Sequence, residues 1–380
     1  MIYIFWISFM ALFYTYFGYP LYQYLRSGIS RRDAAKDVNY KPKVSIVFSA
    51  YNEEDYVLDK IENLLKSDYP GDRLEILACS DGSTDSTGNL LSGIKDNRVK
   101  AFVFEKRRGK PSVLNDIVPL ADGEIVVLCD VRQKFDKDAV SQLVSNFADN
   151  RIGCVSGELI FIDAGSERGI SDGIGLYWEY EKFIRRCESN IHSMVGATGA
   201  IYAIRKYLYV DLPADVILDD VYIPLSIVRK GYRSIFDPSA KAYDRPATTP
   251  AGEYRRKVRT LAGNYQIFRF FPGLFIPLKN HMALALFSHK FLRLLAPFSM
   301  IMMFLSNLFM AKESFYGSTL VCQVIFYILA ILGSMTYRDA DKRLFVRIAS
   351  TAYAFCLMNF TAIIGLYRYL FGKQKVAWEK

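Results

Sequence analysis

Five polar residues of this 380-residue chain stand where they could act together on one ligand. The run "EIVVLCD" (124–130) is short and rich in Val, Ile and Leu, which predicts a strand buried on both faces, and it ends in a carboxylate. A single acid at a strand end often only caps a turn. Polar side chains after each of several strands instead indicate a site, and here they are Asn52, Glu53, Asp81, Lys110 and Asp130.

Strand-like and helix-like segments alternate around these residues. The predicted strands are 43–50, 74–80, 99–105 and 124–130, each separated from the next by a helix-like or polar segment. Such alternation predicts an α/β fold with a mostly parallel sheet and helices on both faces. In these sheets ligands collect at the carboxyl ends of the strands.

The glycine patterns of common nucleotide-binding loops are missing. Neither GxGxxG nor GxxxxGK[ST] occurs, which argues against a dinucleotide dehydrogenase and a P-loop NTPase. The segment "DGSTD" (81–85) is also compatible with a capped turn. Carboxylates and one lysine beside a membrane anchor suit a nucleotide whose diphosphate is held by a metal ion.

Four segments without any charged residue predict membrane spans. They are 1–25, 294–311, 314–337 and 348–367, and a helix that crosses the hydrocarbon core needs roughly 20 apolar residues. The first run lacks a basic start and a small-residue cleavage site, so it is predicted to be a retained anchor.

The basic residues beside these runs predict their orientation. Arg26, Arg31 and Arg32 follow the first run, which places residues 26 to about 290 in the cytoplasm. We therefore expect a multi-pass protein of the plasma (bacterial inner) membrane with a cytoplasmic catalytic domain. For the tail 372–380 the basic residues and the parity of the spans disagree, which leaves its side open.

Cysteines and net charge exclude other classes of protein. The six cysteines show no CxxC pairing and no metal-ligand spacing with the three histidines, which fits reduced thiols. The formal net charge is +9, and its basic residues gather near span ends and at 255–259. This distribution fits anionic lipid and a phosphorylated substrate better than nucleic acid.

An ordered set of motifs resembles the membrane-bound family 2 glycosyltransferases of the cellulose, hyaluronan and chitin synthase group. The motifs are "VSIVFSAYNEE", "CSDGSTDST", "GKPSVLN", "LCDVRQ", "GATGAIYAIRK", "LDDVYIP", "FDPSAKAYD" and "RRKVRTLAGNYQ". They cover roughly residues 43 to 290. The resemblance implies a GT-A fold, Rossmann-like with a mixed sheet, and inverting transfer of a sugar from a nucleotide diphosphate.

The same resemblance implies roles for the strand-end residues. Asn52, Glu53 and Asp81 match positions that hold the base and the ribose. Lys110 matches the lysine near the nucleotide, and Asp130 matches the first acid of the DxD motif, which meets the diphosphate and its metal. The implied cofactor is a divalent cation, Mg²⁺ or Mn²⁺, bound at Asp130.

Two motifs depart from the pattern of the resembled family. Arg132 stands in place of the second DxD acid; it cannot ligate a cation, but its guanidinium could neutralise phosphate. In "RRKVR" the family's QxxRW becomes Arg256-x-x-Arg259-Thr260, so charge for the leaving diphosphate is kept while the tryptophan's stacking platform is lost. This change leaves open whether sugar addition is processive.

Two adjacent acids are the candidates for the catalytic base. By resemblance Asp220 matches the general base that deprotonates the acceptor hydroxyl, with Asp219 beside it. Acids at the start of a helix are also common for purely structural reasons, because they oppose the helix dipole.

We therefore predict an inverting membrane glycosyltransferase that extends a polysaccharide or glycolipid. Coupling of this transfer to translocation of the product across the membrane is left open. A single-addition enzyme with a lipid-linked acceptor and a non-catalytic nucleotide-sugar sensor are the alternatives. The expected partners are a nucleotide sugar (a UDP-sugar first), a saccharide or lipid-linked acceptor, and membrane lipids, without nucleic acid. The predicted domains are a span (1–25), a GT-A domain (40–265), an interface segment (266–290), three spans (291–371) and a tail (372–380).

Overall fold

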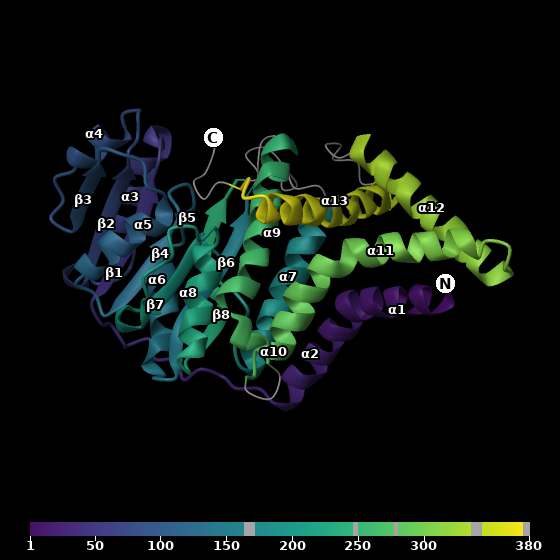
Figure 1. Cartoon of the computed structure of the whole chain (residues 1–380). Coiled ribbons are helices and arrows are strands. Elements are labelled where there is room, and N and C mark those ends of the chain that lie inside the picture. Colours follow the sequence, from purple (N-terminus) through teal and green to yellow (C-terminus); the bar gives the residue numbers. More distant parts are fainter. Residues whose placement is uncertain (163–171, 246–249, 277–279, 336–343, 375–380) are drawn as a thin grey trace. The chain divides into compact units, whose positions relative to one another are not determined.

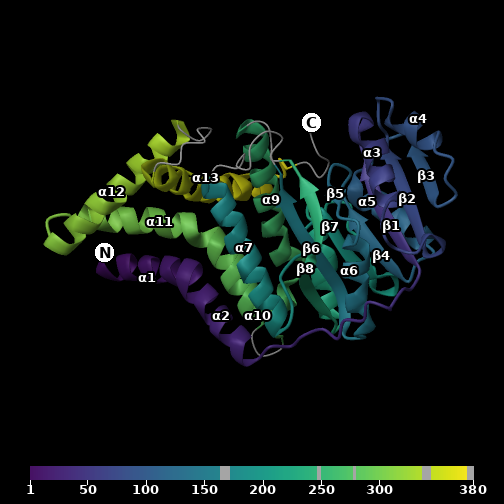
Figure 2. The same ribbon diagram turned by 180° about the vertical axis from the view of Figure 1, so that it is seen from behind.

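The computed structural model describes the chain except for residues 163–171, 246–249, 277–279, 336–343 and 375–380. Figures 1 and 2 show it from opposite sides. The described residues divide into two compact units. Apart from these gaps, the sheet unit consists of Arg31–Ile162 and Glu188–Arg245, and the helical unit of Met1–Ser30, Asp163–Cys187 and Pro246–Gln374.

The sheet unit is built on an eight-stranded sheet, in the order β3-β2-β1-β4-β7-β6-β8-β5. β1 is parallel to β2 and β4, and β2 is parallel to β3, whereas β7 runs antiparallel between β4 and β6. The predicted mixed, mostly parallel sheet is confirmed. The strands are β1 (Val44–Ala50), β2 (Leu74–Asp81), β3 (Val99–Phe104), β4 (Ile125–Cys129), β5 (Lys134–Phe135), β6 (Ile152–Phe161), β7 (Ile201–Arg205) and β8 (Arg233–Asp244).

Helices cover both faces of this sheet, as predicted. Side chains alternate along β1, so Ile46 and Phe48 pack in one apolar cluster and Val47 packs in another. The first cluster includes residues of α3 (Glu54–Leu65) and α6 (Ala139–Ser145). The second includes residues of α5 (Lys110–Ile117) and α8 (Asp219–Arg229). Each fully buried aliphatic side chain contributes about 1.5–3 kcal/mol, which fixes the helices against the sheet.

Short helices complete the sheet unit. They are α4 (Thr87–Ser92) and the 3₁₀ helices η2 (Gly71–Arg73), η3 (Val118–Leu120), η4 (Asn146–Ala148) and η5 (Lys206–Leu208).

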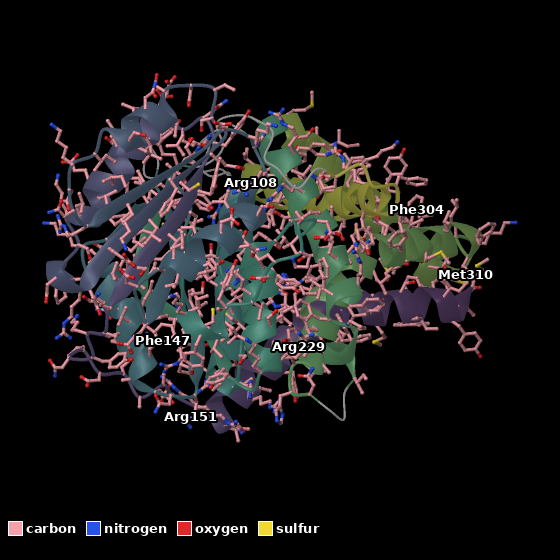
Figure 3. The ribbon with its side chains drawn as sticks, turned by 60° about the vertical axis from the view of Figure 1, so that its left-hand side comes forward. Arg108, Phe147, Arg151, Arg229, Phe304 and Met310 are labelled. Atoms are coloured by element: carbon pink, nitrogen blue, oxygen red, sulfur yellow. The ribbon has the colours of Figure 1, made fainter. Side chains whose placement is uncertain are left out.

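One edge of the sheet gathers the predicted site residues. β1, β2 and β4 are mutually parallel through β1, so their carboxyl ends lie at the same edge, and Asn52, Asp81 and Asp130 stand at those ends. In Figure 3 Arg108, from the loop after β3, lies at the end of the unit opposite to Phe147 and Arg151, which precede β6. The site is therefore at the Arg108 end.

The helical unit contains long apolar helices. The elements of this unit are α1 (Ile2–Phe13), the π-helical η1 (Tyr14–Gly18), α2 (Tyr19–Ile29), most of α7 (Asp172–Ile191), α9 (Pro250–Phe270), η6 (Pro272–Phe275), α10 (Ala283–Ala285), the π-helical η8 (Leu286–Phe291), α11 (Leu292–Phe309), α12 (Ser314–Met335) and α13 (Leu344–Leu370). In both views α1 lies alongside α11 (Figures 1 and 2).

Four helices in the described residues are long and apolar enough to cross a membrane. They are Ile2–Ile29, Ala283–Phe309, Ser314–Met335 and Leu344–Leu370. Each charge-free run of the sequence falls on one of them, so the predicted apolar helices are present, although residues 336 and 337 lie outside the described part. How many of them cross, and from which side, stays a prediction. Among residues 266–290, the described ones include parts of α9 and η8 together with η6 and α10, whereas 277–279 lie outside the described part. An interfacial position of this segment also stays a prediction.

Candidate active site

A lysine and two aspartates form the centre of the strand-end site. Asp130 directly follows β4, whereas Lys110 and Asp219 are the first residues of α5 and α8. The Lys110 ammonium lies 2.8 Å from Asp130 Oδ1 and 3.2 Å from Asp219 Oδ2. Three segments distant in sequence thus place a cation between two carboxylates.

The environment of Lys110 keeps it charged. Burial lowers the pKa of its ammonium, but the neighbouring charges of Asp130 and Asp219 raise that pKa by more, so the net shift is upward. The exposed fractions of the Asp130 and Asp219 side chains are 41% and 11%. Asp130 is therefore the carboxylate of this group that a ligand from solvent can reach.

The two adjacent acids of α8 differ in their surroundings. Asp219 Oδ2 also accepts a hydrogen bond of 3.0 Å from the hydroxyl of Tyr202, which is fully buried. Burial, followed by the charge of Asp219, raises the pKa of Tyr202 well above its ordinary value, so this hydroxyl stays a donor. Asp220 Oδ2 accepts from the backbone N–H of Gly199 at 3.0 Å. Asp219 is thus fixed in the interior, while Asp220 is only half-buried.

Gly199 lies between the two ligand-facing carboxylates. A Cβ at this position would stand 3.3 Å from Asp220 Oδ2 and 3.7 Å from Asp130 Oδ2. The Asp130 oxygen on this side is not Oδ1, which accepts from Lys110. Asp130 and Asp220, 90 residues apart by number, therefore flank one small space. The motif "GATGAIYAIRK" contains Gly199 and Tyr202, but its pattern indicates no role in the site for either residue.

Asn52 and Asp81 join the loops that border the site. Asn52 adopts a positive φ of 53°, and its Oδ1 accepts from the N–H of Thr84 at 2.8 Å. Asp81 is buried, and its two oxygens accept from the N–H groups of Arg108 and Gly109, both at 2.8 Å. These contacts bring the loops after β1, β2 and β3 together. A role in holding the base or the ribose stays a prediction.

Arg132 and Glu53 form an ion pair. Arg132 Nη2 lies 3.0 Å from Glu53 Oε1, and Arg132 Nε donates to both carboxylate oxygens at 3.2 and 3.1 Å. Arg132, which stands in place of the second DxD acid, is thus anchored to Glu53, which the resemblance assigns to the base and the ribose. Its side chain is still 50% exposed, so it remains available to a ligand.

Arg256 and Arg259 lie one turn apart on α9, which belongs to the helical unit. Thr260 Oγ1 donates to the carbonyl of Arg256 at 3.0 Å, so it bonds to its own helix. The predicted contact of the two arginines with the leaving diphosphate stays a prediction.

The residues near Asp130 fit a cation that is bound jointly by the protein and the donor's phosphates better than a cation bound by protein side chains alone. Among the residues that the structure describes, no group of three or more His, Cys, Asp or Glu side chains could hold a metal ion. Mg²⁺ commonly binds through one or two carboxylates together with substrate phosphates and water. Asp130, with Oδ2 directed away from Lys110, could supply one such ligand.

Comparison with known families decides the class of the sheet unit. A model of "Glycosyl transferase family 2" matches residues 45–209, which include β1 to β4 and β7 with the site residues up to Gly199. The chain carries a glycosyl transferase family 2 domain. The prediction made from the motifs is thereby confirmed.

Curated relatives of this chain are polysaccharide synthases. Poly-beta-1,6-N-acetyl-D-glucosamine synthase of Staphylococcus aureus is 27% identical over 253 residues, which cover 62% of this chain and 60% of the relative. The synthase of the same name from Staphylococcus epidermidis is 27% identical over 233 residues, or 59% of this chain and 55% of the relative. The chain therefore matches somewhat more than half of these relatives' length.

A solved glycosyltransferase shares the fold along nearly the whole chain. It is the mannosyltransferase PcManGT from Pyrobaculum calidifontis, solved in complex with GDP-Man and Mn²⁺. The TM-score is 0.73 at 22% sequence identity, covering 97% of this chain and 99% of the mannosyltransferase. The predicted GT-A fold with additional apolar helices is confirmed at the level of fold.

Proposed function

We propose that this chain transfers a sugar from a nucleotide-diphosphate sugar, with inversion at the anomeric carbon, to a growing polysaccharide or glycolipid. The observation that carries the proposal is the arrangement of Lys110, Asp130 and Asp220 at the carboxyl ends of the strands. It combines a cation, a carboxylate open to a ligand and a second carboxylate across a small space. A protein that only binds a nucleotide sugar would need no catalytic base beside the donor site.

Each residue has a step in this proposal. The Asp220 carboxylate takes the proton of the acceptor hydroxyl as its oxygen attacks the anomeric carbon. The bond from that carbon to the phosphate oxygen breaks, and the nucleoside diphosphate leaves with the electron pair. Lys110 stabilises the negative charge that grows on the leaving group. A divalent cation at Asp130, when bound, would supply further positive charge to the diphosphate.

The relatives support a polysaccharide product. Their names describe synthases of a polymer of N-acetylglucosamine. A UDP-sugar is the first donor to test. Single addition to a lipid-linked acceptor is the second candidate. It is favoured by Thr260, which bonds to its own helix and offers no aromatic surface to a sugar. The apolar helices and their basic flanks support a multi-pass protein of the plasma membrane with a cytoplasmic catalytic domain.

A screen of radiolabelled nucleotide sugars with membranes that contain the full chain tests this function, with sizing of the products. Long products would support the synthase, and products one sugar longer than a lipid acceptor would support single addition. Binding of a donor without transfer to any acceptor would favour a sensor and contradict the proposal.

Asp130→Asn should abolish transfer and weaken binding of the nucleoside diphosphate. The amide cannot share a cation with the phosphates, and Lys110 loses the charge of its partner 2.8 Å away. We expect the dissociation constant measured with Mn²⁺ to rise by about tenfold or more, which corresponds to about 1.4 kcal/mol. In EDTA the parent protein should bind the nucleoside diphosphate as weakly as the variant does. Equal affinities with Mn²⁺ would reduce Asp130 to a turn-capping residue, and full activity in EDTA would refute a metal at this site.

Gly199→Ala should slow transfer without loss of the fold. The added methyl group would lie 3.3 Å from Asp220 Oδ2, and a shift of the base by a fraction of an ångström should lower kcat by roughly tenfold. Gly93→Ala is the matched control, because its nearest neighbours would be 3.6 Å away and its φ of −79° suits alanine. Equal kcat values for the two variants would contradict a crowded space at Gly199.

A further inference from the structure

Lys60 is a fully buried lysine on the apolar face of α3. Its exposed fraction is 1%, and its helical neighbours Val57, Ile61 and Leu64 belong to the core. Removing an ammonium from water is costly unless it has strong partners, so lysine is almost never fully buried. A lysine in this position therefore needs an explanation that packing does not provide.

The contacts of the Lys60 ammonium all lie on the chain around Asp130. It donates to the carbonyl oxygen of Gln133 at 2.8 Å and lies 4.0 Å from the centre of the Phe135 ring. Within the described ranges no carboxylate lies within ion-pairing distance of it.

Gln133 and Phe135 follow Asp130 by three and five residues, so the amine holds the C-terminal side of the segment that carries Asp130 and Arg132. Asn63, one turn further along α3, holds the same segment. Its side chain donates to the carbonyl of Phe135 at 2.9 Å and accepts from the N–H of Phe135 at 2.7 Å.

We propose that Lys60 is a positioning residue for the donor site: its buried amine fixes the segment that follows Asp130 to α3. The inference rests on the proposed function, because it assigns Lys60 to the site that holds the donor's diphosphate. Lys60 touches neither donor nor acceptor in this assignment, and it acts through Asp130.

The cost of burying the Lys60 amine distinguishes a positioning role from ordinary packing. Burial lowers the pKa of Lys60, and the opposing effects of the neighbouring Cys129 and Asp130 do not reverse that shift, so burying this amine costs free energy. An apolar side chain of similar length would fill the space without the cost of burying a charge. The lysine therefore lowers stability at a place where it supports the site, which is common for functional residues.

Lys60→Met in the full-length protein tests the proposal. Methionine keeps the length and removes the charge and the donors. We expect kcat to fall by about tenfold or more, because a shift of a contact group by about 1 Å can cost on the order of 100-fold, and nucleoside diphosphate binding to weaken. The midpoint of thermal unfolding should be unchanged or higher. Lys66→Met is the matched control at the C-cap of the same helix, since Lys66 is 65% exposed and pairs with Glu62 one turn away; it should leave both readouts unchanged.

Two further variants keep the test decisive if Lys60→Met does not fold. Asn63→Ala removes the bonds to Phe135 without a change of charge and should lower kcat in the same direction, and Lys60→Arg should restore part of the activity. Parent-like kcat and diphosphate affinity in folded Lys60→Met, or in Asn63→Ala, would overturn the proposal. Failure of the parent protein to transfer any donor would refute the proposed function instead, and diphosphate affinity alone would then decide the role of Lys60.

Discussion

Asp220→Asn is expected to lower kcat by about 10² to 10⁴, the usual contribution of a general base. The amide keeps the shape of the side chain but cannot accept the proton of the acceptor hydroxyl. The dissociation constant of the donor should stay within about threefold, because the proposed function assigns Asp220 to the acceptor rather than to the donor. Single-turnover transfer of radiolabelled sugar and equilibrium binding of the nucleoside diphosphate give the two quantities separately.

Asp219→Asn is the matched control, since it makes the same chemical change one residue earlier. The structure predicts a different result for it. Asp219 pairs with Lys110 and accepts from buried Tyr202, so its loss should weaken donor binding and stability more than it slows the proton transfer. A larger fall in kcat for Asp219→Asn than for Asp220→Asn would make Asp219 the base. Parent-like kcat in both variants would reduce the pair to a helix start.

Glu181→Gln is expected to lower the free energy of unfolding by about 3–5 kcal/mol, because it removes one partner of a buried ion pair. Glu181, on α7 in the helical unit, bonds to Arg293 and lies 3.0 Å from Nε2 of His289. The exposed fractions of the Glu181 and Arg293 side chains are 9% and 13%. Glutamine would leave the guanidinium buried without a counter-charge. Thermal unfolding of the detergent-solubilised protein measures the loss.

Glu179→Gln provides the control on the same helix. Glu179 is 71% exposed and pairs with Lys182 at the surface, and such pairs contribute about 0–1 kcal/mol. Burial raises the pKa of Glu181, but Arg293 and His289 lower it by more, so the net shift is downward. A depressed pKa gives stability that is present above the ordinary value of a glutamate and is lost as the pH falls through the folded value. Equal unfolding midpoints for the two variants would contradict a stabilising role for the Glu181 pair.

Local patterns in the sequence were sufficient for the elements and for most of the predicted site. Mostly apolar segments of five to eight residues became β1, β2 and β4, because a strand that is buried on both faces is rich in apolar residues. The parallel order of these strands then brought Asp81 and Asp130 to one edge. Long charge-free runs became the four apolar helices, since the hydrocarbon core sets their length.

Pairings between distant segments could not be read in this way. The guanidinium of Arg132, which could neutralise phosphate, is also held by Glu53, 79 positions earlier in the chain, and no local pattern indicated this pair. Lys60 carried a signal, because the 3.6-residue repeat of Val57, Ile61 and Leu64 places it on the buried face of α3. That signal does not name its partner.

The sequence alone determined the class of the protein: a parallel α/β domain with acids and one lysine at its strand ends, attached to apolar helices. Only the tertiary structure decided how those charges are divided. It placed Lys110 between Asp130 and Asp219, bound Asp219 to Tyr202, and left Asp220 across Gly199 from Asp130. The reason is physical, because strand and helix patterns depend on neighbours a few residues away. The partner of each charge depends instead on which distant loops the packed sheet brings together.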